Sequence, residues 1–313
     1  LQLMLVRART LAKRQRSGIA FEVRRDLTSA LKAALPYELT DDQKQAIREI
    51  TADMTAPERM HRLLMGDVGT GKTVVALFAM LLAVENDFQA VLMAPTELLA
   101  EQHARNFNAW LEPLGVRVAL LTGRQTGKVR AALEADLASG AIQVAVGTHA
   151  LFQEDIAFQR LVLAIVDEQH RFGVHQRLQL REKGQHEGRF PHQLVMTATP
   201  IPRTLAMTAY ADLDVSIIDE LPPGRTPIKT VVLPDTRRSD IVERIDTACR
   251  SGRQAYWVCP LIDESDLVRY EAAEKTAAQL AEALPDVRIG LIHGRMAGKQ
   301  KDAVMTSFKQ GKL

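Results

Sequence analysis

Seven short apolar runs, most of them separated by helical patterns, occupy residues 37–224 of the chain. This alternation is typical of a parallel sheet covered by helices, because parallel neighbours need a long crossover connection. Helical patterns at 72–84, 97–110 and 128–138 are long enough to make right-handed crossovers onto one sheet. The expected strands are 62–65, 90–94, 117–121, 143–146, 161–166, 194–197 and 215–218. The sequence therefore predicts an α/β fold.

A second, shorter alternation follows residues 221–224, where two prolines and a glycine stop either kind of element. Three strands are fewer than a doubly wound sheet usually contains, so we expect an incomplete second domain. The expected division is a helical segment at 1–36, a first domain at 37–224 and a truncated second domain at 225–313. The expected strands of the second domain are 229–233, 255–261 and 288–292, and its expected helices are 239–250, 266–284 and 298–309.

Composition and charge exclude several classes of protein. The 313 residues are 46% hydrophobic and 25% charged, which excludes a disordered or collagen-like chain, and no stretch is apolar enough to predict a membrane span. The net charge of +2 is uneven, because residues 1–35 hold eight basic and two acidic side chains. This basic segment suits contact with a phosphate backbone, but its helical spacing of apolar residues is equally typical of a solvated amphipathic helix.

Residues 66–73 read Gly-Asp-Val-Gly-Thr-Gly-Lys-Thr and lie between an expected strand and an expected helix. This is the phosphate-loop pattern, in which glycines let backbone amides and the helix N-terminus face a phosphate. Lys72 can reach the outer phosphates, and the hydroxyl of Thr73 can hold Mg²⁺. The sequence therefore predicts a nucleotide site. Its glycines are Gly66, Gly69 and Gly71.

An acidic pair, Asp167-Glu168, follows the apolar run at 161–166. Ligands of such sheets bind at the carboxyl ends of the strands, where this pair is expected. Asp167 would hold Mg²⁺ through water, and Glu168 would polarise an attacking water. An acidic pair after a strand is also typical of a plain solvated strand end, which is the alternative.

Three further features have both a functional and a plain interpretation. Gln169-His170 and the hydroxyl residues of Thr197-Ala-Thr199 could transmit the nucleotide state, or they could be simple turns. Gln43 lies before the phosphate loop, where its amide could read the adenine edge, or it could be an exposed helix residue.

The order of these motifs resembles superfamily 2 nucleic-acid helicases and translocases, and within them the RecG family of bacterial branched-DNA helicases. The resemblance runs from about residue 36 to the last residue, and its most specific stretch is 212–225. The related Mfd translocases share the Thr-Ala-Thr-Pro-Ile-Pro-Arg-Thr run at 197–204. They have Asp-Glu-Glu-Gln where this chain has Asp-Glu-Gln-His at 167–170. The other matching motifs are 39–43, 66–73, 94–103, 146–149, 167–173, 258–262 and 293–296.

The resemblance implies two RecA-like motor domains that bind ATP and Mg²⁺ in the cleft between them. It assigns adenine recognition to Gln43, phosphate and metal binding to Lys72 and Thr73, and metal and water positioning to Asp167 and Glu168. It assigns the coupling of hydrolysis to DNA movement to Gln169, His170, Thr197 and Thr199. It assigns contacts with the DNA backbone to Pro95, Thr96, Thr122, Gly123, Thr148, His149 and Arg295.

The function that the resemblance implies is an ATP-dependent DNA helicase and double-stranded DNA translocase that remodels stalled replication forks and Holliday junctions in repair and recombination. We expect a monomer in the bacterial cytoplasm, associated with the nucleoid, with single-stranded DNA-binding protein as a further partner. The family's wedge domain would precede residue 1, and its arginine-bearing motif would follow residue 313. The chain by itself is therefore expected to bind nucleotide and to hydrolyse it weakly.

Three alternatives remain open from the sequence. The first is an Mfd-like transcription-repair coupling translocase, which would bind RNA polymerase. The second, from a different class, is a phosphate-loop kinase or nucleotide switch, which would not need the second alternation after the hinge. The third is a binding module with a degenerate nucleotide site, which the intact Lys72, Thr73, Asp167 and Glu168 disfavour.

Overall fold

The computed structural model describes residues 18–153, 155–168, 190–199, 213–222, 228–259 and 266–313. The chain divides into two compact units, Leu1–Thr226 and Pro227–Leu313. The prediction for residues 1–17 of the basic segment lies outside the described residues, as do those for Gln169 and His170. The division into a linker and two motor domains stays a prediction.

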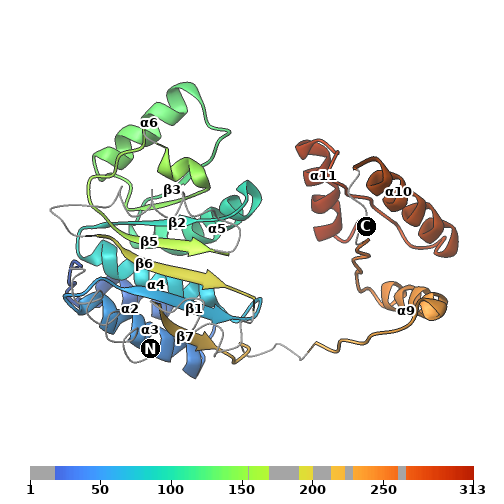
Figure 1. The fold of residues 1–313 in the computed structure, drawn as a ribbon, viewed down its shortest axis with the longest axis horizontal. Coiled ribbons are helices and arrows are strands. Elements are labelled where there is room, and N and C mark those ends of the chain that lie inside the picture. Colours follow the sequence, from blue (N-terminus) through green and yellow to red (C-terminus); the bar gives the residue numbers. More distant parts are fainter. Residues whose placement is uncertain (1–17, 154, 169–189, 200–212, 223–227, 260–265) are drawn as a thin grey trace, which may run out of the picture. The chain divides into compact units, whose positions relative to one another are not determined.

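The first unit contains one parallel sheet of seven strands in the order β3-β4-β2-β5-β6-β1-β7 (Figure 1). All seven strands predicted for this unit are confirmed, and each pairs in parallel with its neighbours. Strands β1 and β2 are consecutive in the chain but are separated in the sheet by β5 and β6. The strands are β1 His61–Gly66, β2 Gln89–Met93, β3 Val118–Leu121, β4 Val144–Gly147, β5 Leu161–Asp167, β6 His192–Thr197 and β7 Asp214–Ile218.

Helices cover both faces of this sheet, so its central strands are apolar on both sides. Alternate residues of β2 belong to different cores: Ala90 and Leu92 pack with the α4 cluster, whereas Val91 and Met93 pack with the cluster that contains Leu137. The helices are α2 Asp26–Ala34, α3 Asp41–Thr55, α4 Lys72–Glu85, α5 Glu97–Leu111 and α6 Gly127–Ala138, with short 3-10 helices at Glu112–Leu114 and His149–Phe152. The three predicted crossover helices are thereby confirmed.

Helix α4 is the central helix of the first unit, and its residues 74–83 are all buried. A helix that is apolar all round must be covered on every side, which explains its uniform hydrophobicity. Residues 18–35 contribute to this cover at the far end of α4 from the phosphate loop. There the carboxylate of Glu85 accepts hydrogen bonds from the backbone of Thr28, at 2.8 Å, and of Arg25, at 3.3 Å.

The second unit contains the helices α9 Arg238–Arg250, α10 Asp266–Ala283 and α11 Gly298–Lys309, as predicted. The three predicted strands are wrong for the described residues, which form no β-ladder in this unit. An apolar run favours extended backbone, but a strand also needs a neighbour to accept its hydrogen bonds. The apolar side chains of these runs lie largely exposed, with Val232 at 93% and Val258 at 78%.

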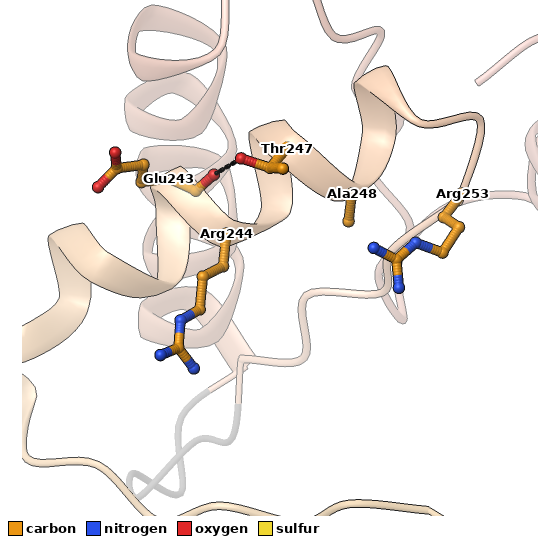
Figure 2. A pocket seen from close by; sticks show the side chains of 5 residues that line it. All are labelled: Glu243, Arg244, Thr247, Ala248 and Arg253. Atoms are coloured by element: carbon orange, nitrogen blue, oxygen red, sulfur yellow. Dashed lines mark hydrogen bonds between the residues drawn. The ribbon is translucent and has the colours of Figure 1, made fainter. Parts of the chain in front are cut away.

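Side-chain contacts in the second unit join its helices to the segments between them. The ring of Tyr256 packs 4.6 Å from that of Phe308 on α11. A shallow pocket follows α9 and the turn after it, where the Thr247 hydroxyl donates to the carbonyl of Glu243 at 3.0 Å (Figure 2). None of the predicted site residues lines this pocket. No helix of the described segments is long and apolar enough to span a bilayer.

Candidate functional site

The structure places most of the predicted site residues at one edge of the sheet, where the carboxyl ends of its parallel strands meet. We call the ends of β5, β6 and β1 the phosphate-loop half of this edge; they lead into Glu168, Ala198 and the loop at 66–71. We call the ends of β3, β4 and β2 the β3-β4-β2 half; they lead into Thr122, Thr148 and Pro95. The edge lies at the change in strand order where ligands of such sheets bind.

The phosphate loop runs from the end of β1 to the first residue of α4. Gly69 and Gly71 have φ values of 80° and 86°, which only glycine adopts readily. A side chain at Gly66 would lie 2.6 Å from the hydroxyl of Thr70 and 2.9 Å from the carbonyl of Ile218 on β7. The glycine positions are therefore required by backbone conformation and by close packing against a neighbouring strand.

Lys72 lies across this loop, with Nζ donating to the carbonyls of Gly66, at 2.6 Å, and Asp67, at 2.9 Å. Burial lowers the pKa of Lys72, while the negative charges of Asp167, Glu168 and Asp67 partly oppose that shift. The ammonium group thus faces the acidic pair predicted from the sequence. Phosphate oxygens beside it would add negative charge and favour its protonated form.

Gln43 is buried beneath the phosphate loop, with 1% of its surface exposed. Its Nε2 donates to the carbonyl of Thr70 at 2.7 Å, and its Oε1 accepts from the backbone of Thr40 at 3.0 Å, within a capping box. The alternative of an exposed helix residue is therefore wrong. Adenine recognition stays a prediction, and in the structure the amide supports the loop and caps α3.

A second contact at the start of α3 was not predicted from the sequence. The carboxylate of Asp42 accepts hydrogen bonds from the backbone of Asp219 and Glu220, just after β7, at 2.9 and 3.0 Å. The carboxylate of Glu220 in turn accepts from the backbone of Asp41 at 3.0 Å. This exchange fixes the start of α3, and with it Gln43, to the chain that leaves the sheet.

Asp167 ends β5 beside Met196 of β6, and Glu168 follows it with a φ of 53°. A left-handed conformation is uncommon for a residue other than glycine and here is held by two hydrogen bonds. The Glu168 amide donates to the carbonyl of Met196 at 2.9 Å, and its carboxylate accepts from the amide of Ala198 at 3.1 Å. The pair is therefore tied to the exit of β6, and a plain solvated strand end does not describe it.

The hydroxyl residues after β6 lie next to this pair. Thr197 is buried, and its hydroxyl accepts from the amide of Thr199 at 3.2 Å, while Thr199 is exposed. Since the carboxylate of Glu168 bonds to Ala198, between the two threonines, one connected set of hydrogen bonds joins them. This arrangement is compatible with the predicted coupling role, which stays a prediction.

His103 on α5 is a site residue that our reading of the sequence missed. Its Nε2 lies 2.9 Å from Oδ2 of Asp167, and the two side chains are 11% and 14% exposed. His103 ends the motif at 94–103, which supported the resemblance to helicases but gave no role to this residue. The contact joins α5 to β5 across 64 positions of the chain and becomes visible only in the tertiary structure.

The β3-β4-β2 half presents its predicted residues unequally. Thr96, Gly123 and His149 are exposed and Pro95 is half-buried, whereas Thr122 and Thr148 are only 3% and 4% exposed. The hydroxyl of Thr96 accepts from the Leu99 amide at 3.3 Å and caps α5. The side chain of Thr122 faces its own loop, where its hydroxyl lies 3.4 Å from Gln125. Arg295 is exposed and belongs to the second unit.

The phosphate-loop half fits the donor set that Mg²⁺ uses beside a bound nucleotide. That set comprises a carboxylate and a hydroxyl, here Asp167 and Thr73, with phosphate oxygens and water. Thr73 is half-buried in the first turn of α4. Within the described residues, no cluster of three or more His, Cys, Asp or Glu side chains could hold a metal alone.

Several known proteins are similar to this chain over most of its length. RecG, the ATP-dependent DNA helicase of Escherichia coli (strain K12), is 60% identical over 288 residues, which are 92% of this chain and 42% of the relative. RecG of Haemophilus influenzae is 54% identical over 97% of this chain and 44% of its own length. A solved structure of RecG bound to a three-way DNA junction is 38% identical, with a TM-score of 0.79 over 96% of this chain and 39% of that one.

The chain thus spans about two fifths of the length of these curated relatives. Its resemblance to RecG is confirmed, as is the α/β fold of its first unit. The family model for DEAD/DEAH box helicases matches residues 40–208, more than half of the chain, and this range includes both halves of the edge described above. The chain belongs to the DEAD/DEAH box helicase family.

Proposed function

We propose that the protein containing this chain is an ATP-dependent DNA helicase and double-stranded DNA translocase that remodels branched DNA. The convergence of the phosphate loop, Lys72, Asp167 and Glu168 at one edge of the sheet carries this proposal. The RecG relatives support DNA as the substrate, and the structure of RecG with a three-way junction supports branched DNA. Stalled forks and Holliday junctions are the branched structures we propose.

In this proposal the phosphate-loop half binds ATP and Mg²⁺. The loop amides and Lys72 hold the phosphates, Thr73 and Asp167 hold the metal, and Glu168 polarises the attacking water. Mg²⁺ supplies charge neutralisation between the phosphates when it is bound. Adenine recognition is assigned to Gln43 from its place in the motif at 39–43. Thr197 and Thr199, together with Gln169 and His170, pass the nucleotide state to the rest of the motor.

The β3-β4-β2 half, in the same proposal, contacts the backbone of one DNA strand. Exposed Thr96 and His149, the half-buried Pro95 and the loop at Gly123 would make these contacts, with Thr122 and Thr148 shaping the loops from beneath. Contacts from hydroxyls, loop amides and helix ends suit a motor that steps without reading sequence. Arg295 would contribute from the second motor domain, at 225–313. We propose a monomeric, cytoplasmic protein that meets single-stranded DNA-binding protein at the nucleoid.

ATP hydrolysis by the full-length protein should be measured with forked DNA, linear duplex DNA and RNA at equal nucleotide concentrations. Forked DNA is expected to stimulate the rate most and linear duplex less, because RecG relatives are DNA helicases. Stimulation by RNA alone would contradict the proposal. Tight capture of RNA polymerase in a pull-down would favour an Mfd-like translocase, and transfer of phosphate to an acceptor other than water would favour a kinase.

A further inference from the structure

We propose that His103 is a positioning residue for the nucleotide reaction, which orients the Asp167 carboxylate for Mg²⁺ by a hydrogen bond from the side of α5. This inference rests on the proposed function, because it deepens the metal role given there to Asp167. His103 itself need not touch nucleotide, metal or water. Its proposed action is exerted through Asp167 alone.

The contact between the two side chains is short and screened from solvent. Nε2 of His103 lies 2.9 Å from Oδ2 of Asp167, and both side chains are at least 86% buried. Hydrogen bonds to a charged carboxylate are among the strong ones, and a low local dielectric strengthens them further. The contact is therefore suited to fixing one oxygen of Asp167, and the other oxygen would be left to hold the metal.

Strand geometry alone does not orient this carboxylate. The β5 to β6 register fixes the backbone of Asp167 opposite Met196. The terminal torsion of an aspartate side chain is broad, however, so a fixed backbone still leaves the two oxygens free to turn. A single donor at Oδ2 removes that freedom. Residues that hydrogen-bond to a metal ligand commonly orient that ligand. Losing one of them typically weakens metal affinity by roughly 10–100-fold.

The surroundings of His103 indicate that this contact is its principal polar interaction. Its other ring nitrogen, Nδ1, is buried and finds no hydrogen-bond partner among the described residues. The ring lies near that of Phe107, one turn later on α5, with centroids 5.8 Å apart. An imidazole buried only for packing would have two ring nitrogens that need hydrogen-bond partners. In His103 the nitrogen that has a partner, Nε2, bonds to the carboxylate of Asp167.

Helix α5 gives the histidine a rigid base. The hydroxyl of Thr96 caps the first turn at 3.3 Å, and the carboxylates of Glu97 and Glu101 hold the guanidinium of Arg124, at 2.7 and 3.4 Å. His103 follows Glu97 by six residues, slightly less than two turns. The imidazole is thus placed against β5 by a capped helix that is also fastened to the loop after β3.

The test compares two substitutions in the full-length protein. His103→Leu removes the donor but fills a similar volume beside Phe107, whereas His103→Gln keeps an amide donor at the distance of Nε2. Arg105→Ala is the matched control, since Arg105 lies on the same helix with a side chain 79% exposed. Thermal unfolding of all variants identifies any loss of folding.

Metal affinity is measured directly, with Mn²⁺ as a stand-in for Mg²⁺ and a non-hydrolysable ATP analogue bound, by electron paramagnetic resonance. His103→Leu is expected to weaken Mn²⁺ binding about tenfold, and His103→Gln and Arg105→Ala by less than about threefold. The same ranking is expected for the Mg²⁺ concentration that gives half-maximal ATP hydrolysis. Analogue binding without metal should be unchanged in all variants.

Equal Mn²⁺ affinity in the wild type and His103→Leu would overturn the inference, as would equal losses in His103→Leu and His103→Gln. If His103→Leu fails to fold, a loss of less than about threefold in His103→Gln supports the inference, and a loss of about tenfold in His103→Gln overturns it. Absence of DNA-stimulated hydrolysis in the wild type would contradict the proposed function instead. The Mn²⁺ ranking would still decide the role of His103 in that case.

Discussion

The two halves of the sheet edge are built from different kinds of groups. In the phosphate-loop half, buried or half-buried side chains act on one another: the charges of Asp167 and Glu168 act on Lys72, and His103 contacts Asp167. In the β3-β4-β2 half, Thr122 and Thr148 are buried, and exposed loop residues form the surface. A chemical site needs fixed side chains, whereas a backbone-binding surface needs accessible ones.

The largest effect is expected from removing the positive charge at the phosphate loop, which tests whether the two halves act separately. Lys72→Ala is expected to lower ATP turnover by about 10³-fold or more, because it removes the ammonium group that lies at the loop and would stabilise the charge on the phosphates. Turnover is measured at saturating forked DNA, and DNA affinity by fluorescence anisotropy. DNA affinity should change little. Wild-type turnover would overturn the site assignment, and a large loss of DNA affinity would show that the halves are not separate.

A milder change in the same half tests the water-positioning role. Glu168→Gln keeps the shape of the side chain and an oxygen that can accept from the Ala198 amide, but it removes the negative charge. General-base contributions of this kind are worth about 10²–10⁴ in rate, so we expect a loss in that range. Binding of a fluorescent ATP analogue should be retained. Loss of both binding and turnover would indicate a structural role for Glu168.

The β3-β4-β2 half is tested by changing an exposed residue. His149→Ala is expected to lower DNA-stimulated turnover by several-fold and to leave turnover without DNA unchanged, because the side chain is exposed and follows β4. Asn106→Ala, an exposed change on α5, is the matched control. The measurement is the ATPase rate with and without forked DNA. An equal drop in both rates would contradict a role for His149 in DNA contact alone.

The smallest expected effect concerns the opposite edge of the sheet, where β6 begins. His192 is fully buried, and its Nδ1 accepts from the Met60 amide at 2.9 Å while its Nε2 donates to the carbonyl of Ile19 at 2.7 Å. Burial lowers the pKa of His192, and the nearby positive charge of Arg59 lowers it further, against the hydrogen bond to Ile19 and the charge of Asp53. The folded state therefore holds this ring neutral.

Below the ordinary histidine pKa of about 6.5, the unfolded chain takes up a proton that the folded state resists. Stability is therefore lost as pH falls below that value, by at most about 1.4 kcal/mol per pH unit for this one group. Urea unfolding at pH 7.5 and 5.5, compared with His192→Gln, measures the effect. A variant with an unchanged pH dependence would contradict it. Because this group lies at the other edge of the sheet, we expect ATP affinity to be unaffected.

The local sequence pattern was sufficient to predict the strands of the first unit. Each predicted strand formed there because helices and neighbouring strands were available to cover and pair it, as with β2 and its two cores. In the second unit the predicted helices formed but the predicted strands did not, within the described residues. A helix satisfies its hydrogen bonds within one segment, whereas a strand depends on a neighbour that its own sequence cannot supply.

The features of the site likewise separate into those that depend on local sequence and those that depend on contacts between distant segments. The sequence by itself determined the phosphate loop, the acidic pair and the strands that carry them, because glycine conformation, helix starts and strand ends are local properties. Only the tertiary structure decided that Gln43 is buried under the loop, that Asp42 and Glu220 exchange hydrogen bonds, and that His103 reaches Asp167. Those contacts join residues from 27 to 179 positions apart, so chain packing alone brings them within hydrogen-bonding distance.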